Sequence, residues 1–332
     1  MNHLFFRDMD HSSSRVLVTG GAGFIGSHLV DGLLRDGWEV TVLDDFSSGR
    51  LENLRGGLDG EALRVVRGDV REASAVRKAL EEVGVVLHLA AVTSVPYSVE
   101  HPDETYQVNV EGTRNLLEEC LRGTAERVIY ISTCAVYGEP EYLPIDEDHP
   151  TRPASPYAES KLEAERLCME FQESYGLRTT VLRLFNVYGS RMRADRYGGV
   201  ISTFMRQLWE GGPLTIYGDG EQTRDFIHVS DAVRAMMLTL TRDDISGETF
   251  NIATGVPTSI NRLAAMISEL RGVEPRPIHL EARAGEPRHS YGDIRRAKER
   301  LGFTPRVSLR EGLQLLLEAA EDRVGFRWGE AV

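Results

Sequence analysis

Short runs of β-branched and leucine residues alternate with amphipathic stretches along the first half of the chain. A strand that is buried on both faces has a continuous apolar run, whereas a surface helix repeats its apolar residues with helical periodicity. Repeated strand–helix units of this kind favour a parallel sheet covered by helices on both faces. We therefore predict a doubly wound α/β domain over residues 15–187, with strands at Val16–Val18, Val40–Leu43, Arg64–Val66, Val85–Leu89, Val128–Ile131 and Thr180–Leu184.

The helical stretches of this domain are expected at Phe24–Arg35, at about 102–122 and at about 158–175. After Asn186 the rhythm breaks into short segments separated by glycine and proline. These segments predict a smaller α/β substrate-binding domain over residues 188–325, from which segments around 223–245 return to the first domain. Its helices are expected at Val200–Trp209, Leu263–Leu270 and Leu309–Ala320.

Composition narrows the kind of ligand. The 332 residues carry a formal net charge of −13, which argues against a nucleic-acid or anionic-membrane surface. Residues 1–14 contain only a short apolar run and are expected to form a flexible leader rather than a signal peptide. No apolar stretch approaches the length of a membrane span. Three scattered cysteines and histidines without metal-ligand spacing favour the reducing cytoplasm and no metal site.

A glycine-rich turn follows the first predicted strand and opens the first helix. Glycines at such a turn allow a pyrophosphate to approach the helix N-terminus closely. The turn comprises Gly20, Gly23, Phe24, Ile25 and Gly26, and it predicts a dinucleotide cofactor.

A carboxylate at the end of the second strand selects between the two nicotinamide cofactors. Asp44 can accept both hydroxyl groups of an adenine ribose and would repel a 2′-phosphate, so NAD is predicted rather than NADP. The neighbouring Asp45 is either a second ribose contact or a solvated loop residue. Asp69 and Val70 close the third strand and are expected beside the adenine.

Tyr157 and Lys161 form a Y-x-x-x-K pair, which places both side chains on one face of the third predicted helix. Chance would produce about 0.1 such pairs in a chain with this number of tyrosines and lysines. A lysine ammonium beside a tyrosine favours the phenolate, so we expect Lys161 to lower the pKa of Tyr157 and make it a general acid and base.

These motifs resemble, in order, those of the extended short-chain dehydrogenase/reductases, the NAD-dependent epimerase/dehydratase family, and the resemblance runs from about Val16 to Phe303. It rests on the glycine-rich turn, Tyr157/Lys161, and the segments His88–Ala91, Ser132–Thr133, Val136–Gly138, Phe185–Gly189 and Thr223–Asp231.

The resemblance implies a Rossmann NAD-binding domain, a tightly held NAD and a catalytic Thr133 beside Tyr157 and Lys161. It also implies that further cofactor contacts come from Leu89, Ala90, Ala91 and Asn109. The nucleotide-sugar substrate is then expected at Asn186, Val200, Tyr217, Arg224, Arg288 and Ser290, with Asn186 and the two arginines near the diphosphate.

Within this family, the residues after the catalytic threonine separate the reactions. Dehydrating and decarboxylating members carry acidic residues there, whereas this chain has Cys134 and Ala135. We therefore expect chemistry at C4 alone, which is epimerisation of a UDP-hexose. Tyr157 takes the proton of the 4-hydroxyl while hydride passes to NAD, Thr133 hydrogen-bonds the 4-oxygen, and hydride returns to the other face of the 4-keto sugar.

The identity of the sugar depends on an arginine-rich loop. Arg193 has the spacing from Asn186 that, in uronate-epimerising relatives, places an arginine at the sugar carboxylate, and arginine suits bidentate recognition of that group. Arg193 and Arg196 are alternatively solvated loop charges. A small Ser290 would leave room for an N-acetyl group or simply form a neutral pocket wall. The prediction is UDP-glucuronate/UDP-galacturonate, with UDP-glucose/UDP-galactose or an N-acetylhexosamine as the alternative.

Two other classes of protein compete with the epimerase. A 4-ketosugar reductase would use the same tyrosine and lysine, but Asp44 disfavours the NADPH on which most reductive steps draw. A catalytically silent NAD-binding protein would not need intact Thr133, Tyr157 and Lys161. The resemblance further implies a homodimer formed through the helices at about 102–122 and 158–175, although these helices could equally pack within one subunit.

Overall fold

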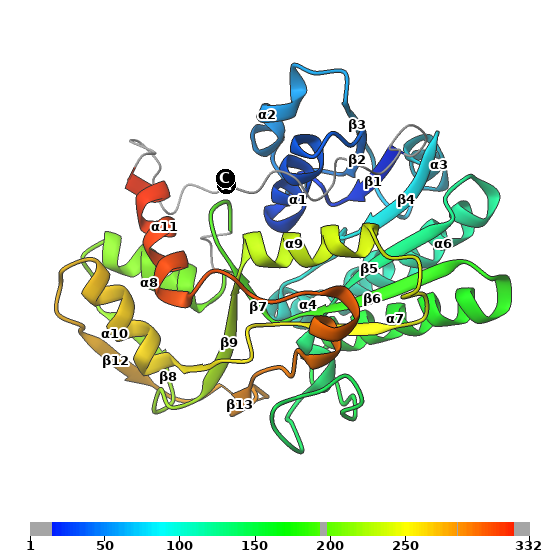
Figure 1. The fold of residues 1–332 in the computed structure, drawn as a ribbon. Coiled ribbons are helices and arrows are strands. Elements are labelled where there is room, and N and C mark those ends of the chain that lie inside the picture. The colour runs from blue at the N-terminus through cyan, green and yellow to red at the C-terminus, as the bar shows by residue number, and fades with distance from the viewer. Residues whose placement is uncertain (1–14, 193–197, 284, 322–332) are drawn as a thin grey trace.

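The computed structural model describes residues 15–192, 198–283 and 285–321. A seven-stranded parallel sheet forms the larger part of the molecule (Figure 1). Its strand order is β10-β6-β5-β4-β1-β2-β3. Strands β1 to β3 are added toward one edge and the later strands toward the other, so the order reverses between β1 and β4. The strands are β1 Arg15–Thr19, β2 Val40–Asp44, β3 Leu63–Arg67, β4 Val83–His88, β5 Arg127–Thr133, β6 Arg178–Leu184 and β10 Thr249–Ile252.

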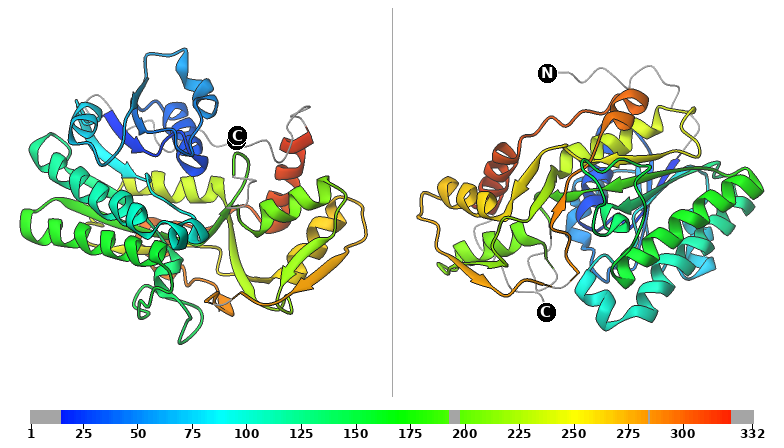
Figure 2. Two further views of the ribbon diagram at one scale, coloured as in Figure 1. Left: turned by 180° about the vertical axis from the view of Figure 1, so that it is seen from behind. Right: turned by 90° about the horizontal axis from the view of Figure 1, so that it is seen from below.

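Helices cover both faces of this sheet, as the continuous apolar strands predicted (Figure 2). Val16 and Val18 of β1 pack into a core with helices α1 and α9, whereas Leu17 between them packs into the core below α6 and α7. The helices of this part are α1 Phe24–Arg35, α2 Arg55–Leu58, α3 Ala73–Ala79, α4 Val95–Glu100, α5 Pro102–Tyr106, α6 Gly112–Arg122, α7 Pro156–Tyr175 and α9 Val229–Leu240.

The smaller part has its own sheets and its own apolar core. In one sheet β9 pairs with β7, β11 and β13, and in a second β8 pairs with β12. Helices α8, α10 and α11 enclose this core. The elements are β7 Asn186–Tyr188, α8 Val200–Trp209, β8 Leu214–Tyr217, β9 Thr223–His228, β11 Pro257–Ser259, α10 Ile260–Leu270, β12 Pro277–Leu280, β13 His289–Ser290 and α11 Leu309–Glu321.

The predicted fold class is confirmed, but the number of strands is not. The sequence pattern gave six strands, and the seventh, β10, lies at the edge beside β6. It enters the sheet after the chain has run from β6 through β7, α8, β8, β9 and α9. Of the segment around 223–245 that was expected to return, α9 packs against α1, while β9 belongs to the smaller sheets.

The helix expected at about 102–122 contains a local irregularity. Residues Gln107–Glu111 form a π-helical turn between α5 and α6. Such turns insert one extra residue into a helix and are frequent at functional sites. Here the turn contains Asn109, whose side chain is 1% exposed. No helix among the described residues is both long enough and apolar enough to cross a membrane.

Candidate active site

The glycine-rich turn lies at the reversal point of the sheet, where open α/β sheets bind their ligands. Gly20 has a φ of +67°, and a Cβ on it would lie 2.9 Å from the backbone nitrogen of Ala90 in the loop after β4. A Cβ on Gly26 would overlap the carbonyl oxygen of Gly20. Phe24 follows as the first residue of α1, directly after Gly23. The turn therefore leaves a cradle of bare backbone at a helix N-terminus, which fits the pyrophosphate of NAD.

Asp44 ends β2 beside this cradle, as the sequence predicted for a ribose contact. Its carboxylate accepts hydrogen bonds from the backbone N–H groups of Ala22 (2.9 Å) and Phe46 (2.8 Å). Burial raises its pKa, and these two bonds oppose the rise. Asp45 instead accepts from Ser47 in an exposed loop, which favours the solvated alternative. Asp44 is thus the carboxylate held in place by the turn.

The second carboxylate expected near the adenine has a partner that the sequence did not indicate. Asp69 forms an ion pair of 2.5 Å with Arg71, and hydrogen bonds from this guanidinium lower its pKa. Val70 is buried, and its side chain packs where a Cβ on Gly112 would lie. Any adenine contact made by Asp69 would share the carboxylate with Arg71.

A buried chain of hydrogen bonds joins the loop after β4 to helix α6, which carries Thr113. The Thr19 hydroxyl accepts from the backbone N–H groups of Leu89 and Ala90, both at 3.1 Å, and lies 2.6 Å from Nδ1 of His88. Nε2 of His88 lies 2.9 Å from the Thr113 hydroxyl, which donates to the carbonyl of Asn109. Because Thr113 has a single proton to donate, Nε2 of His88 carries a hydrogen and Nδ1 accepts from Thr19.

Asn109 extends this chain to the helix that carries the Y-x-x-x-K pair. Its side-chain amide accepts from the N–H of Val92 (2.7 Å) and donates to the C=O of Val92 (3.0 Å). Val92 directly follows Ala91, which was predicted to contact the cofactor. It also donates to the hydroxyl of Ser160, which in turn donates to the carbonyl of Tyr157. The sequence missed Thr19, Thr113 and Ser160, because a hydroxyl that links two elements carries no local pattern.

Thr133 ends β5, and Tyr157 and Lys161 of α7 lie beside this strand. The Thr133 side chain accepts from the N–H of Ala135 (3.2 Å) and hydrogen-bonds Tyr157. Ser155 caps α7 by accepting from the N–H of Ala158, which places Tyr157 in the first turn. The three residues that the sequence proposed as catalytic are therefore neighbours in space.

The electrostatics of this pair differ from the expectation. Burial raises the pKa of Tyr157 to about 12, against a smaller opposing effect of its hydrogen bond with Thr133. Burial also lowers the pKa of Lys161 to about 7, against the attraction of Glu165. The pKa of Tyr157 is thus raised rather than lowered as predicted, because burial disfavours its charged form more than the hydrogen bond with Thr133 favours it.

The positions that would hold an additional acid lack one here. Burial raises the pKa of the Cys134 thiol to about 12, and this thiol hydrogen-bonds Ser290. Ala135 has no ionisable group. Cys134 therefore stays a neutral thiol at physiological pH and does not supply a second proton-transfer group beside Tyr157.

The expected substrate residues come from the smaller part of the molecule. Arg224 on β9 is opposite Ser290 on β13, and its guanidinium lies 3.6 Å from Glu286. Arg288 instead forms a bidentate pair with Asp219, at 2.6 and 2.8 Å. Both arginines expected at a diphosphate thus have carboxylate partners in the ligand-free protein.

The other predicted substrate residues are on β7, β8 and α8. Asn186 on β7 donates to the carbonyl of Asp225 (3.0 Å). Tyr217 ends β8, and the guanidinium of Arg283 lies 3.8 Å from the centroid of its ring. Val200 begins α8. Arg193 and Arg196 lie outside the described residues.

Asp225 lies in the segment Thr223–Asp231 that carries the family resemblance, but the sequence predicted no role for it. It is fully buried and accepts from both N–H and hydroxyl of Thr254, from the N–H of Gly255 and from the N–H of Gly292. These bonds join the end of β10 to β9. Asp225 thereby fixes the strand on which Arg224 lies.

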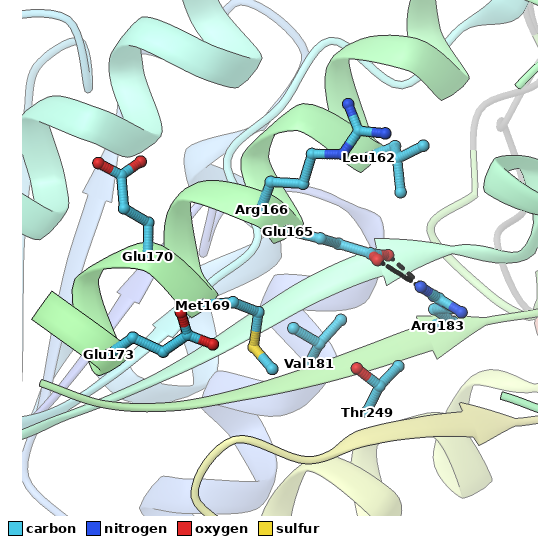
Figure 3. Close-up of a pocket in the computed structure, with 9 residues that line it drawn as sticks. All are labelled: Leu162, Glu165, Arg166, Met169, Glu170, Glu173, Val181, Arg183 and Thr249. Carbon is cyan, nitrogen blue, oxygen red and sulfur yellow. Dashed lines mark hydrogen bonds and ion pairs between the residues drawn. The ribbon is translucent and has the colours of Figure 1, made fainter. Parts of the chain in front are cut away.

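A groove of about 460 Å³ lies outside this site, between α7 and the strands β6 and β10 (Figure 3). The carboxylate of Glu165 and the guanidinium of Arg183 point toward one another across it and form three hydrogen bonds of 2.6 to 3.2 Å. Arg183 also donates to the hydroxyl of Tyr137 (3.0 Å). This buried pair ties α7 to the sheet one helical turn beyond Lys161.

The chain is similar to known proteins over most of its length. Residues 16–253 match the NAD dependent epimerase/dehydratase family. A putative UDP-glucose 4-epimerase of Methanocaldococcus jannaschii is 38% identical over 90% of this chain and 96% of its own length. UDP-glucuronic acid decarboxylase 1 of Xenopus tropicalis is also 38% identical, over 90% of this chain and 70% of its own.

Among solved structures, MoeE5 in complex with UDP-glucuronic acid and NAD superimposes with a TM-score of 0.85 at 39% identity. The match covers 94% of this chain and 100% of that one. The family resemblance and the NAD cofactor predicted from the sequence are confirmed. The chain belongs to the NAD-dependent epimerase/dehydratase family of extended short-chain dehydrogenase/reductases.

Proposed function

We propose that this protein is an NAD-dependent isomerase that inverts the configuration at C4 of a UDP-linked sugar. The observation that carries the proposal is the grouping of Thr133, Tyr157 and Lys161 at β5, followed by Cys134 and Ala135 without a carboxylate. UDP-glucose 4-epimerases among the relatives support this reaction.

In this reaction the chain positions the sugar and moves one proton. The glycine cradle and Asp44 would hold NAD, which would supply reversible hydride acceptance. Tyr157 removes the proton of the sugar 4-hydroxyl and returns it after the sugar has presented its other face. Thr133 hydrogen-bonds the 4-oxygen and the Tyr157 hydroxyl, and the charge of Lys161 stabilises the phenolate.

Decarboxylation is the rival reaction that the relatives raise, because UDP-glucuronic acid decarboxylases match this chain as well as the epimerases do. Loss of carbon dioxide after oxidation at C4 needs an additional acid. Cys134 is a neutral buried thiol and Ala135 is apolar, so the residues after Thr133 supply none. We therefore favour retention of the carboxylate and epimerisation.

For the sugar, we propose UDP-glucuronate/UDP-galacturonate over UDP-glucose/UDP-galactose and UDP-N-acetylhexosamines. The spacing of Arg193 from Asn186 supports the uronate. MoeE5, to which this chain is similar, has been solved with UDP-glucuronic acid. The same protein has also been solved with UDP-glucose, so these ligands do not separate the two sugars. Ser290 bonds Cys134 and is small enough to admit a substituent at C2.

Replacing Arg193 with alanine tests the sugar. We expect kcat/KM for UDP-glucuronate to fall by about 10- to 100-fold, because a charge-assisted hydrogen bond to the carboxylate is lost. The value for UDP-glucose should stay within about threefold, since it has no such group. Arg196→Ala, in the same loop, is the matched control and should leave the ratio between the two sugars unchanged. An unchanged ratio in Arg193→Ala would remove the argument for a uronate.

We further propose that the protein is a homodimer. Val99 of α4, Tyr106 of α5 and Leu121 of α6 are 63%, 47% and 41% exposed. Exposed apolar residues on these helices support a protein interface there. Light scattering would distinguish the dimer from a 37.0 kDa monomer.

A cytoplasmic location remains a prediction from the sequence.

A further inference from the structure

The ammonium of Lys161 lies over an aromatic ring. Its Nζ is 4.1 Å from the ring centroid of Tyr130, within the range of a cation–π interaction. Tyr130 is on β5, three residues before Thr133, and faces the apolar core below α7. Lys161 and Tyr130 are only 3% and 1% exposed, so this contact is largely removed from water. Cation–π attraction is strongest in such surroundings.

The charged and titratable groups around Lys161 determine how much the Tyr130 ring contributes to stabilising the ammonium. On its own helix, Glu165 attracts the ammonium but is bound to Arg183 of β6 by three hydrogen bonds (Figure 3). Burial keeps the thiol of Cys168 and the phenol of Tyr157 neutral. The carboxylate that attracts Lys161 is therefore already paired with an arginine, and the ring face is left to stabilise the ammonium.

His88 of β4 completes these surroundings and is also neutral. Its hydrogen bonds with Thr19 and Thr113 fix one tautomer, with one nitrogen donating and the other accepting. Its ring lies 5.7 Å from that of Tyr130 and helps to hold it in place. A second positive charge beside Lys161 is thereby avoided.

The hydroxyl of Tyr130 has no part in this arrangement. It is buried without a hydrogen-bond partner among the described residues. Unsatisfied buried hydroxyl groups destabilise a protein, so the aromatic face rather than the polar end explains what this side chain does at the site.

We propose that Tyr130 is a positioning residue whose ring holds Lys161 in its charged form and in place for catalysis. The proposal rests on the function proposed above for Tyr157 and Lys161. It assigns a role in this reaction to a side chain that contacts neither the sugar nor the proton-transfer atoms.

The charge of Lys161 can be measured directly, because Lys78, Lys161 and Lys298 are the lysines of the chain. Protein labelled with ¹³C at the lysine Cε and carrying its cofactor is titrated by NMR, with Lys78→Arg and Lys298→Arg used to assign the signals. We expect Tyr130→Leu to lower the pKa of Lys161 by about one unit relative to Tyr130→Phe, which keeps the ring. Tyr130→Met serves as a second ring-free variant that fills more of the volume if Tyr130→Leu does not fold.

The pH dependence of turnover gives the second measurement. Activity requires the ammonium and is lost as the pH rises through the pKa of Lys161. The alkaline limb of kcat should therefore lie about one unit lower in Tyr130→Leu than in Tyr130→Phe, with most of the loss recovered at lower pH. Tyr130→Phe should stay within about twofold of the unsubstituted enzyme, because only an unpaired hydroxyl is removed.

The two proposals fail in different ways. Absence of turnover of every UDP-sugar by the unsubstituted protein would contradict the proposed function, while the NMR titration would still decide the role of Tyr130. Equal Lys161 pKa values in Tyr130→Phe and in the ring-free variants would overturn the role of Tyr130, whatever the activity.

Discussion

Replacing Tyr157 with phenylalanine is expected to lower kcat for the UDP-sugar by about 100- to 10,000-fold, the range for loss of a positioned general acid and base. The change removes only the hydroxyl that exchanges the proton of the sugar 4-hydroxyl. The hydrogen bonds that position this residue use its backbone, through Ser98 and Ser160, and stay in place. Bound NAD and the thermal midpoint should therefore change little.

Steady-state epimerase assays with the NAD content measured on the same preparation check this prediction. Tyr175→Phe is the matched control, because Tyr175 ends the same helix and is 61% exposed. It should leave kcat unchanged. Retention of more than a tenth of kcat by Tyr157→Phe would show that another group carries the proton.

Replacing Gly26 with alanine is expected to remove most of the bound NAD. The added Cβ would overlap the carbonyl oxygen of Gly20 and lie 2.8 Å from the Cα of Gly21. Both are backbone atoms of the turn and cannot rotate aside, so the turn must open. Overpacking of this size costs about 1–3 kcal/mol, which corresponds to about 5- to 150-fold weaker NAD binding.

Release of NAD on denaturation of the purified protein, measured enzymatically, tests this expectation. Gly60→Ala is the control, because the nearest atom to its Cβ would be a carbonyl oxygen at an ordinary 3.7 Å. That variant should retain NAD. A full complement of NAD in Gly26→Ala would mean that the turn does not form the cofactor cradle.

The sequence was sufficient to predict the features that depend on local pattern. Six strands, the glycine turn and the Tyr157/Lys161 spacing each follow from residues close together in the chain. The seventh strand, β10, does not, because its four residues pair with β6, which lies far earlier in the chain. Its pattern is too short to distinguish from the other short strands of that region.

Contacts between residues that are far apart in the sequence were also missed. Asp225 joins β9 to the segment after β10, and Arg183 pairs with Glu165 across 18 residues. Neither partner can be identified from spacing. The predicted direction of the pKa shift of Tyr157 was wrong, because helical spacing gives its distance from Lys161 but says nothing about how deeply both are buried.

The central claim is that C4 of a UDP-sugar is oxidised and reduced within one enzyme. Protein purified without added cofactor is incubated with UDP-glucose and UDP-glucuronate that carry deuterium at C4, and the products are followed by NMR. We predict interconversion with the 4-epimer, full retention of deuterium at C4 and no accumulation of NADH. Loss of the label to solvent, stoichiometric NADH or release of carbon dioxide would contradict the account.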